Sequence, residues 1–378
     1  MSLPAILTGL LPALLLVLVC AVPDAPAQDY SSTHHRFRLS VAADGLAHPW
    51  ALAFLPDGDI LVSEREGRLR VIRHGRLLPE PVRGLPDVRV MGQGGLLDLL
   101  PHPDFRTNRL LYFSYAADLD GGVTTHVARA RLEKDTLSDI DVLFRAEPAS
   151  GGRVHFAGRL AFDPQGHLYV SVGDRGEMER AQRLGDLAGK VVRLHDDGRV
   201  PADNPFVDTP GARPEIFSYG HRNIQGMAVH PGTGEVWTHE HGPRGGDEIN
   251  VIRPGMNYGW PVVTLGIDYT GFTIGDGLKH VPGMADPLHY WIPSIAPSGM
   301  AFYASDRFSR WKGDLFVGAL VQRHLVRLRL AGEVVVEEER LLEDLGRRIR
   351  DVRVGPDGSL WLLTDHDLGQ VLRLDPLD

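Results

Sequence analysis

Short apolar segments separated by polar turns recur along the whole chain. Six units share one pattern, in which an apolar triplet leads through a turn into an alternating apolar strand, and the triplets begin at residues 52, 99, 160, 227, 300 and 352. In the first unit, the triplet 52–54 is followed by Pro56-Asp57-Gly58 and then by the strand 60–62. Proline and glycine fix the backbone of such a turn, so each unit predicts two antiparallel strands.

The spacing of these units predicts the fold class. Strand pairs that recur every 47 to 73 residues are typical of β-propeller blades, and further apolar strands follow at 69–72, 191–194 and 371–374. We therefore predict an all-β protein, a single six-bladed β-propeller of four-stranded antiparallel blades over residues 36–378. The strand 37–41 precedes the first unit and is expected to pair with the last blade and close the ring. A pair of β-sandwiches would not explain the recurrence.

The N-terminal segment has a different pattern. Residues 3–22 are almost wholly apolar and are followed by Ala25-Pro26-Ala27, which is typical of a signal-peptidase site. We predict a signal peptide at 1–27 and a short linker at 28–35, hence a periplasmic or secreted protein. The alternative is an uncleaved anchor, which would be the chain's one attachment to a membrane.

Composition and charge narrow the function classes. The 43 glycines and 27 prolines suit a fold rich in tight turns. The net charge of −9 argues against a nucleic-acid partner, which requires a basic surface. The single cysteine excludes a disulfide framework and a cysteine-rich zinc site.

Polar, glycine-rich segments lie close to the starts of several units, at 92–95, 155–159, 219–226 and 240–248. Segments at equivalent ends of neighbouring blades should face a common pocket. Near the last unit, Arg348 and Arg350 alternate on an extended segment and should point to one face. Two guanidinium groups on one face suit a polyanionic ligand.

The order of eight motifs makes the interpretation more specific. They are HPWALAFLPDG (48–58), GQGGLLD (92–98), HFAGRL (155–160), SYGHRNIQGMA (218–228), EHGPRGGDEIN (240–250), NYGWP (257–261), SGMAFY (298–303) and RRIRDV (347–352). Over roughly residues 36–376 the chain resembles the soluble aldose sugar dehydrogenases that depend on pyrroloquinoline quinone (PQQ). The resemblance implies a six-bladed propeller that oxidises aldose sugars at the anomeric carbon to lactones. It also implies hydride transfer to PQQ and electrons passed on to an external acceptor.

The resemblance implies roles for individual residues. His155 matches the catalytic general base, and Arg222 matches the residue that polarises the quinone carbonyl. The positions that match cofactor-binding groups are Gln93, Asn223, Arg348 and Arg350. Trp291 matches an aromatic wall near the substrate.

Two positions depart from the family pattern. The family commonly has a lysine where this chain has Val321, so either Arg323 substitutes for it or one cofactor contact is absent. An acidic or amide residue often precedes the catalytic histidine, and here that residue is Val154.

The resemblance also implies calcium. Gly242 and Pro243 match positions whose backbone carbonyls bind the calcium ion that clamps the cofactor. Asp247, Glu248 and Tyr258 match a second, structural calcium site.

Other readings of the sequence stay open. His239 and His241 would share one strand face, as a metal pair does. A calcium-dependent propeller lactonase or hydrolase would need side-chain carboxylates at a central metal, which the central candidates do not supply. A non-catalytic ligand-binding propeller would not require these residues in this order. Both a monomer and a homodimer agree with the sequence, and the preferred aldose depends on loops such as 263–290.

Overall fold

The computed structural model describes residues 27–377. The predicted signal peptide therefore lies outside the described residues, apart from Ala27. Within this described range, no helix is both long enough and apolar enough to cross a bilayer.

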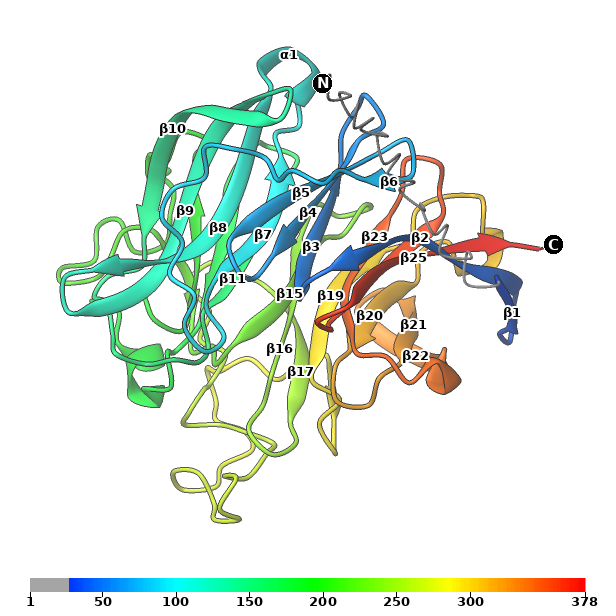
Figure 1. Cartoon of the computed structure of the whole chain (residues 1–378). Coiled ribbons are helices and arrows are strands. Elements are labelled where there is room, and N and C mark those ends of the chain that lie inside the picture. The colour runs from blue at the N-terminus through cyan, green and yellow to red at the C-terminus, as the bar shows by residue number, and fades with distance from the viewer. Residues whose placement is uncertain (1–26, 378) are drawn as a thin grey trace, which may run out of the picture.

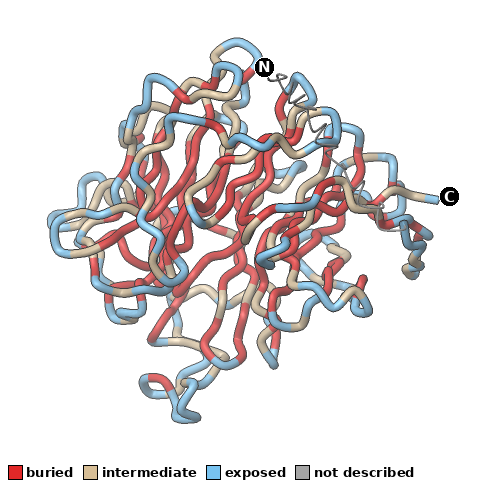
Figure 2. The backbone as a smooth tube through the Cα atoms, in the orientation of Figure 1, coloured by how far each residue is buried: buried red, intermediate tan, exposed pale blue. Residues whose placement is uncertain are grey.

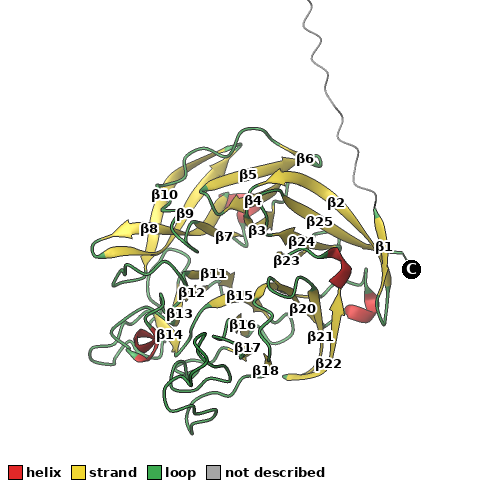
Figure 3. Ribbon diagram, turned by 60° about the horizontal axis from the view of Figure 1, so that its bottom comes forward, coloured by secondary structure: helices red, strands yellow, loops and turns green. Residues whose placement is uncertain are grey.

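Six antiparallel sheets surround a central axis, which Figure 3 shows nearly end-on. Blade one contains β3 (Pro49–Phe54), β4 (Ile60–Glu64), β5 (Arg68–Arg73) and β6 (Arg76–Leu77), and blade two contains β7 (Leu96–Pro101), β8 (Leu110–Leu119), β9 (Gly122–Glu133) and β10 (Thr136–Arg145). Blade three contains β11 (Ala157–Phe162), β12 (Leu168–Val172), β13 (Lys190–Leu194) and β14 (Ile216–Tyr219), and blade four contains β15 (Ile224–Val229), β16 (Val236–Glu240), β17 (Asp247–Val251) and β18 (His289–Trp291).

The remaining two blades follow the same order (Figure 1). Blade five contains β19 (Pro297–Phe302), β20 (Leu315–Ala319), β21 (Leu325–Ala331) and β22 (Val334–Leu341), and blade six contains β23 (Ile349–Val354), β24 (Leu360–Thr364), β25 (Gly369–Pro376) and β2 (Arg36–Leu46). The helical turns are α1 (Phe105–Asn108) and three 3-10 segments at Met178–Gln182, Ser309–Trp311 and Glu343–Leu345. The predicted all-β, six-bladed propeller is confirmed.

Both ends of the described chain build the last blade. As predicted, β2 pairs with β25 and closes the ring. The structure differs from the expected linker at 28–35, because β1 (Gln28–Ser31) pairs with β2 as a fifth strand on the edge. Three of its four side chains are exposed, so no alternation of apolar and polar residues marks the strand in the sequence.

The six inner strands contact their neighbours around the axis and are largely buried (Figure 2). Apolar side chains fill the space between blades, for example Leu61, Leu96 and Phe113 between blades one and two. Each large side chain buried in this way contributes about 1.5–3 kcal/mol to folding. This rigid ring holds the loops at its two ends.

Each inner strand carries a β-bulge near its start. The pairing register shifts in β3, β7, β11, β15, β19 and β23, so that extra residues face the second strand of the blade. In three blades a bulge N–H donates to a serine hydroxyl on that second strand, namely Ala51 to Ser63, Asp98 to Ser114 and Arg159 to Ser171. A bulge re-aims the side chain of the extra residue. The same device, repeated six times, directs side chains toward one end of the axis.

Candidate active site

A cavity of about 450 Å³ lies at the end of the axis where the inner strands begin. Its lining comes from all six blades: His48, Trp50, Arg65, Gln93, Leu97, Phe156, Ala157, Asn223, Gln225, His241, Ala296, Leu320, Val321, Arg348, Arg350, Asp365, His366 and Asp367. The unpaired bulge residues of β3, β15 and β23 are Trp50, Gln225 and Arg350, and all three line it. The predicted residues Gln93, Asn223, Arg348 and Arg350 are thus brought together.

Arg348 and Arg350 share one carboxylate. Oδ2 of Asp365 accepts hydrogen bonds from Nη2 of Arg348 (3.1 Å) and Nη2 of Arg350 (2.9 Å), and Nδ1 of His48 lies 3.0 Å from its Oδ1. Burial opposes ionisation of Asp365, but the two arginines and His48 hold its pKa well below the usual range. Asp365 therefore stays ionised and fixes both guanidinium groups at the cavity wall.

An amide chain continues this arrangement across the cavity. Nη1 of Arg350 donates to Oε1 of Gln225 (3.3 Å), whose Nε2 donates to Oδ1 of Asn223 (3.2 Å). The charged lining residues are three arginines and two aspartates, whereas the whole chain carries a net charge of −9. The cavity is therefore more positive than the chain around it, as an anionic ligand requires.

His155 lies at the edge of the cavity, next to the lining residues Phe156 and Ala157. Its backbone N–H donates to Oε1 of Gln93 (2.8 Å), and its backbone φ is 52°. A left-handed φ at a residue other than glycine stores strain and is common at functional sites. The local fold thus holds His155 in an unusual conformation beside a predicted cofactor-binding residue.

Asp174 orients the imidazole. Nδ1 of His155 lies 2.6 Å from Oδ1 of Asp174, and Nε1–H of Trp260 donates to Oδ2 (2.8 Å). Burial opposes ionisation of Asp174, but the hydrogen bond from His155 and the positive charges nearby lower its pKa. A Cβ on Gly173 would lie 2.0 Å from the carbonyl oxygen of His155, so glycine is needed for this close approach.

Asp174 and Trp260 were not predicted from the sequence. The motif pointed to the residue preceding His155, but Val154 is exposed and its backbone carbonyl accepts a hydrogen bond from Arg175. The carboxylate that orients the imidazole instead follows the adjacent strand β12. A Gly-Asp pair directly after an apolar strand was the available signal, at residues 173 and 174.

Arg222 is buried beside the same group of residues. Its backbone N–H donates to Oε2 of Glu240 (2.5 Å), its Nη1 donates to the carbonyl of His241 (3.1 Å), and its guanidinium carbon lies 5.3 Å from the ring of Trp260. Its carbonyl accepts the N–H of Asp174 (2.9 Å). The two predicted catalytic residues, His155 and Arg222, are therefore linked through Asp174. The buried Nε of Arg222 has no hydrogen-bond partner among the described residues.

Two predicted residues do not join this group. Trp291 is buried in the core between blades four and five, and its Nε1–H donates to Oε2 of Glu338 (3.1 Å). Strand alternation exposes its neighbours Tyr290 and Ile292 instead. Arg323 is exposed and does not line the cavity, whereas Val321 does. Trp291 is therefore not an aromatic wall of this cavity, and Arg323 does not replace the missing lysine there.

The segment 241–245 forms one wall of an adjoining cavity of about 590 Å³, which shares His241, Ala296 and Val321 with the first. Gly242 and Pro243 line it. A Cβ on Gly242 would lie 2.3 Å from the carbonyl oxygen of Gly245, so the tight loop requires glycine there.

The three residues of the predicted second calcium site have protein partners. Asp247 accepts hydrogen bonds from the N–H groups of Gly242, Ile295 and Ala296 and from the Ser294 hydroxyl, and the Tyr258 hydroxyl donates to the Val251 carbonyl. Glu248 lies opposite Glu240 in the β16–β17 ladder, and burial together with the Glu240 charge raises its pKa. Asp247 thus anchors two loops, with one hydrogen bond to its Oδ1 and three to its Oδ2. The second calcium site stays a prediction.

Within residues 27–377, no group of three or more His, Cys, Asp or Glu side chains could hold a metal ion. His241 lines the cavity, while His239 is fully buried and its two ring nitrogens find no partner in the described range. A calcium ion at Gly242 and Pro243 would depend on carbonyl oxygens.

Comparison with known proteins decides the family. A family model described as Glucose / Sorbosone dehydrogenase matches residues 46–373. The chain belongs to the glucose/sorbosone dehydrogenase family. Within the family, Aldose sugar dehydrogenase YliI of Escherichia coli (strain K12) is 47% identical over 343 residues, which cover 89% of this chain and 92% of that protein.

Solved structures of the family agree with the fold. The soluble aldose sugar dehydrogenase from Escherichia coli in the apo-form is 46% identical, with a TM-score of 0.87 over 90% of this chain and 99% of that one. The PQQ-bound form of aldose sugar dehydrogenase from Streptomyces coelicolor is 29% identical, with a TM-score of 0.74 over 93% of this chain and 99% of that one. The resemblance inferred from the sequence motifs is confirmed.

Proposed function

We propose that this protein is a PQQ-dependent dehydrogenase that oxidises aldose sugars at the anomeric carbon to lactones. One observation carries the proposal: His155, whose imidazole is oriented by the buried carboxylate of Asp174, directly precedes Phe156 and Ala157, which line the same cavity as Arg348 and Arg350. Membership of a family that contains a PQQ-bound aldose sugar dehydrogenase supports it.

The cavity residues fit the cofactor. PQQ is a flat tricarboxylate, and Arg348 and Arg350 offer guanidinium groups suited to carboxylates. Gln93 and Asn223 offer amides on the same cavity wall, and Arg222 keeps a buried Nε–H without a partner in the described residues. When bound, the quinone supplies two-electron chemistry that accepts a hydride.

His155 would remove the proton of the anomeric hydroxyl. The ionised Asp174 accepts the proton-bearing Nδ1, so Nε2 is the basic nitrogen of the neutral ring. As Nε2 takes the proton, the negative charge of Asp174 stabilises the imidazolium that forms. Loss of the hydroxyl proton and of a hydride from the anomeric carbon converts the aldose to its lactone.

Arg222 would stabilise negative charge. Its guanidinium group is buried and held by the His241 carbonyl and by the ring of Trp260, so it needs little reorganisation. A fixed positive group in a buried site favours charge that develops as the sugar is oxidised. Trp260 contacts both Arg222 and Asp174, and this contact fixes the two groups relative to each other.

We further propose calcium as a second cofactor. The carbonyl oxygens of Gly242 and Pro243 would bind it, since calcium is a hard cation that prefers oxygen ligands.

The apolar segment 3–22 and the Ala25-Pro26-Ala27 motif favour a periplasmic or secreted location. The sequence has no C-x-x-C-H haem motif, so electrons would leave to an external acceptor. A monomer and a homodimer are both compatible with these proposals.

Reconstitution tests the function. Purified protein is mixed with PQQ and calcium, and dye reduction is followed with a panel of aldoses. We expect turnover that requires both an aldose and PQQ. No quinone-dependent turnover with any aldose, together with no spectral change of the added PQQ, would refute the proposal.

Two histidine variants distinguish the loss of the general base from a general loss of protein integrity. His155→Ala should lower turnover by about 10²- to 10⁴-fold, the usual contribution of a general base. His167→Ala is the matched control, because Nδ1 of His167 also lies beside an aspartate, Asp163 (3.0 Å), but in the β11–β12 turn. Undiminished turnover in the His155 variant would refute the proposed base while leaving cofactor binding intact.

A further inference from the structure

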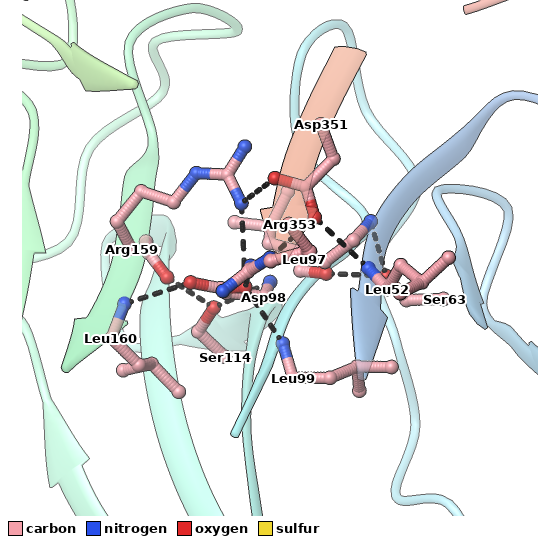
Figure 4. A network of polar contacts seen from close by, with 12 residues as sticks. Leu52, Ser63, Leu97, Asp98, Leu99, Ser114, Arg159, Leu160, Asp351 and Arg353 are labelled. Carbon is pink, nitrogen blue, oxygen red and sulfur yellow. Dashed lines mark hydrogen bonds and ion pairs between the residues drawn. The ribbon is translucent and has the colours of Figure 1, made fainter. Parts of the chain in front are cut away.

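Four charged side chains form a closed ring just beneath the cavity (Figure 4). This axial ring consists of Asp98 on β7, Arg159 on β11, and Asp351 and Arg353 on β23. Arg159 Nη1 lies 3.4 Å from Asp98 and 3.0 Å from Asp351, and Arg353 lies 2.8 Å from each of the same carboxylates. Two positive and two negative charges therefore balance within one buried group.

The carboxylates of the axial ring also hold backbone N–H groups of neighbouring blades. Oδ2 of Asp351 accepts the N–H of Leu52 on β3 (3.0 Å), and Oδ2 of Asp98 accepts the N–H of Leu160 on β11 (2.9 Å). Blades one, two, three and six thus meet at the ring. Because a buried charge without its partner is costly, removal of either arginine should destabilise the ring.

Arg159 reaches upward from the ring to the cavity floor. Its Nε donates to the carbonyl of Gln225 (2.7 Å), and its Nη2 donates to the carbonyl of Arg350 (3.4 Å). Its guanidinium carbon lies 4.1 Å from the centre of the Trp50 ring. These three partners are the unpaired bulge residues of blades one, four and six, and each lines the cavity.

Arg353 has the same ion-pair partners but faces the other way. It lines the hollow at the opposite mouth of the axis, with Phe54, Pro101 and Phe302 among its neighbours there. The two arginines therefore share the task of charge balance, and Arg159 alone touches the floor of the cavity described above. This difference makes Arg353 a matched control for Arg159.

We propose that Arg159 is a positioning residue that sets the places of Arg350, Gln225 and Trp50 and thereby the affinity of the cavity for its polyanionic cofactor. The guanidinium fork has donors enough to bind two carboxylates and two carbonyls at once, which an ammonium group cannot do in one plane. This inference rests on the proposed function for the identity of the ligand, PQQ.

The test compares Arg159→Met with Arg353→Met in the full protein. PQQ is titrated into each variant with calcium present, binding is followed by the absorbance of PQQ, and stability is measured by urea unfolding without PQQ. Both variants should lose stability, and Arg159→Met should lose more because it also gives up the hydrogen bonds to the Gln225 and Arg350 carbonyls. Only Arg159→Met should lose affinity, by about tenfold or more, as outer-shell partners of a bound group typically do.

Arg159→Lys keeps the test decisive if the methionine variants fold poorly. A lysine can still pair with Asp98 and Asp351, but it lacks the fork that reaches the Gln225 and Arg350 carbonyls. We expect weaker PQQ binding and a smaller loss of stability than in Arg159→Met. At saturating PQQ, the pH profile of kcat should stay unchanged, because neither His155 nor Asp174 is among the partners of Arg159 named above.

The outcomes separate the two proposals. If wild-type protein does not bind PQQ, the proposed function fails. If wild-type protein binds PQQ and Arg159→Met binds it equally well, the positioning role alone is refuted. The role is refuted as well if Arg353→Met loses as much affinity as Arg159→Met, because the effect would then follow from the broken ring.

Discussion

Replacing Asp174 by asparagine removes a charge from the site while keeping its shape. The carboxylate faces three donors, which are Nδ1 of His155 (2.6 Å), Nε1 of Trp260 (2.8 Å) and the N–H of Gly176 (2.7 Å). An amide offers one oxygen and one NH₂ group, so at least one buried donor meets another donor. A buried donor left without an acceptor costs about 1–3 kcal/mol.

The larger effect should fall on turnover. If the amide NH₂ faces the imidazole, Nδ1 becomes the acceptor and Nε2 carries the proton, so the ring cannot take a proton from the sugar. The charge that stabilises the imidazolium is also lost. We expect kcat to fall about 10²- to 10⁴-fold, in the range found when the carboxylate behind a catalytic histidine is replaced.

The assay measures kcat for an aldose at saturating PQQ, and PQQ affinity separately. Asp163→Asn is the matched control, because it removes the carboxylate beside His167 at the other end of the β11–β12 hairpin. Affinity should change little in both variants, and kcat should fall only in Asp174→Asn. Equal kcat values in the two variants would refute the role given to Asp174.

Three further predictions concern other parts of the molecule. Asp247→Ala should lower the free energy of unfolding by about 3 kcal/mol or more in urea, because it leaves four donors without an acceptor; an unchanged value would show that the loops do not depend on Asp247. Burial lowers the pKa of Lys190 to about 7 from 10.5, so the folded protein binds fewer protons than the unfolded chain between these values, and stability relative to Lys190→Met should rise from pH 7 to pH 10. A constant difference would contradict this sign. Trp291→Phe should leave PQQ affinity unchanged and lower the free energy of unfolding by about 1 kcal/mol, because the hydrogen bond to Glu338 is lost. A large loss of PQQ affinity would show that Trp291 does belong to the binding site.

The fold could be predicted because its signals are local. An apolar triplet followed by a polar turn specifies a strand and a turn within about ten residues, and the chain repeats that signal in every blade, with Pro-Asp-Gly itself in blades one and six. The strand β1 was missed because its exposed side chains carry no pattern, and only its backbone pairs with β2. Whether an exposed segment pairs with the edge of a sheet depends on the folded structure beside it and not on its own pattern of residues.

The site was predictable where a motif carries the chemistry. Gln93, Asn223, Arg348 and Arg350 converge on one cavity, as their places near the blade starts indicated. A bulge turns Arg350 toward the axis, whereas Gln93, Asn223 and Arg348 lie in the loops that lead into the inner strands. A one-residue shift of register is not visible in the pattern of apolar residues.

Partners brought together across strands were not predictable. Asp174 is 19 residues beyond His155, and Asp365 meets His48 from the far end of the chain. Trp291 has the residue type of a substrate wall, but strand alternation turns its ring into the core. Residue type and order alone do not determine which face of a strand a side chain occupies.

The most direct test of the central claim is a titration of the calcium-loaded protein with PQQ, followed by absorbance, for the wild type and for an Arg348→Met/Arg350→Met double variant. We predict one PQQ bound per chain in the wild type, with affinity that weakens as salt is added, because salt screens the attraction between the anionic cofactor and the arginines of the cavity. The double variant should bind far more weakly at the same salt concentration. Equal binding by both proteins, or no binding by the wild type, would contradict the assignment of this cavity to the quinone.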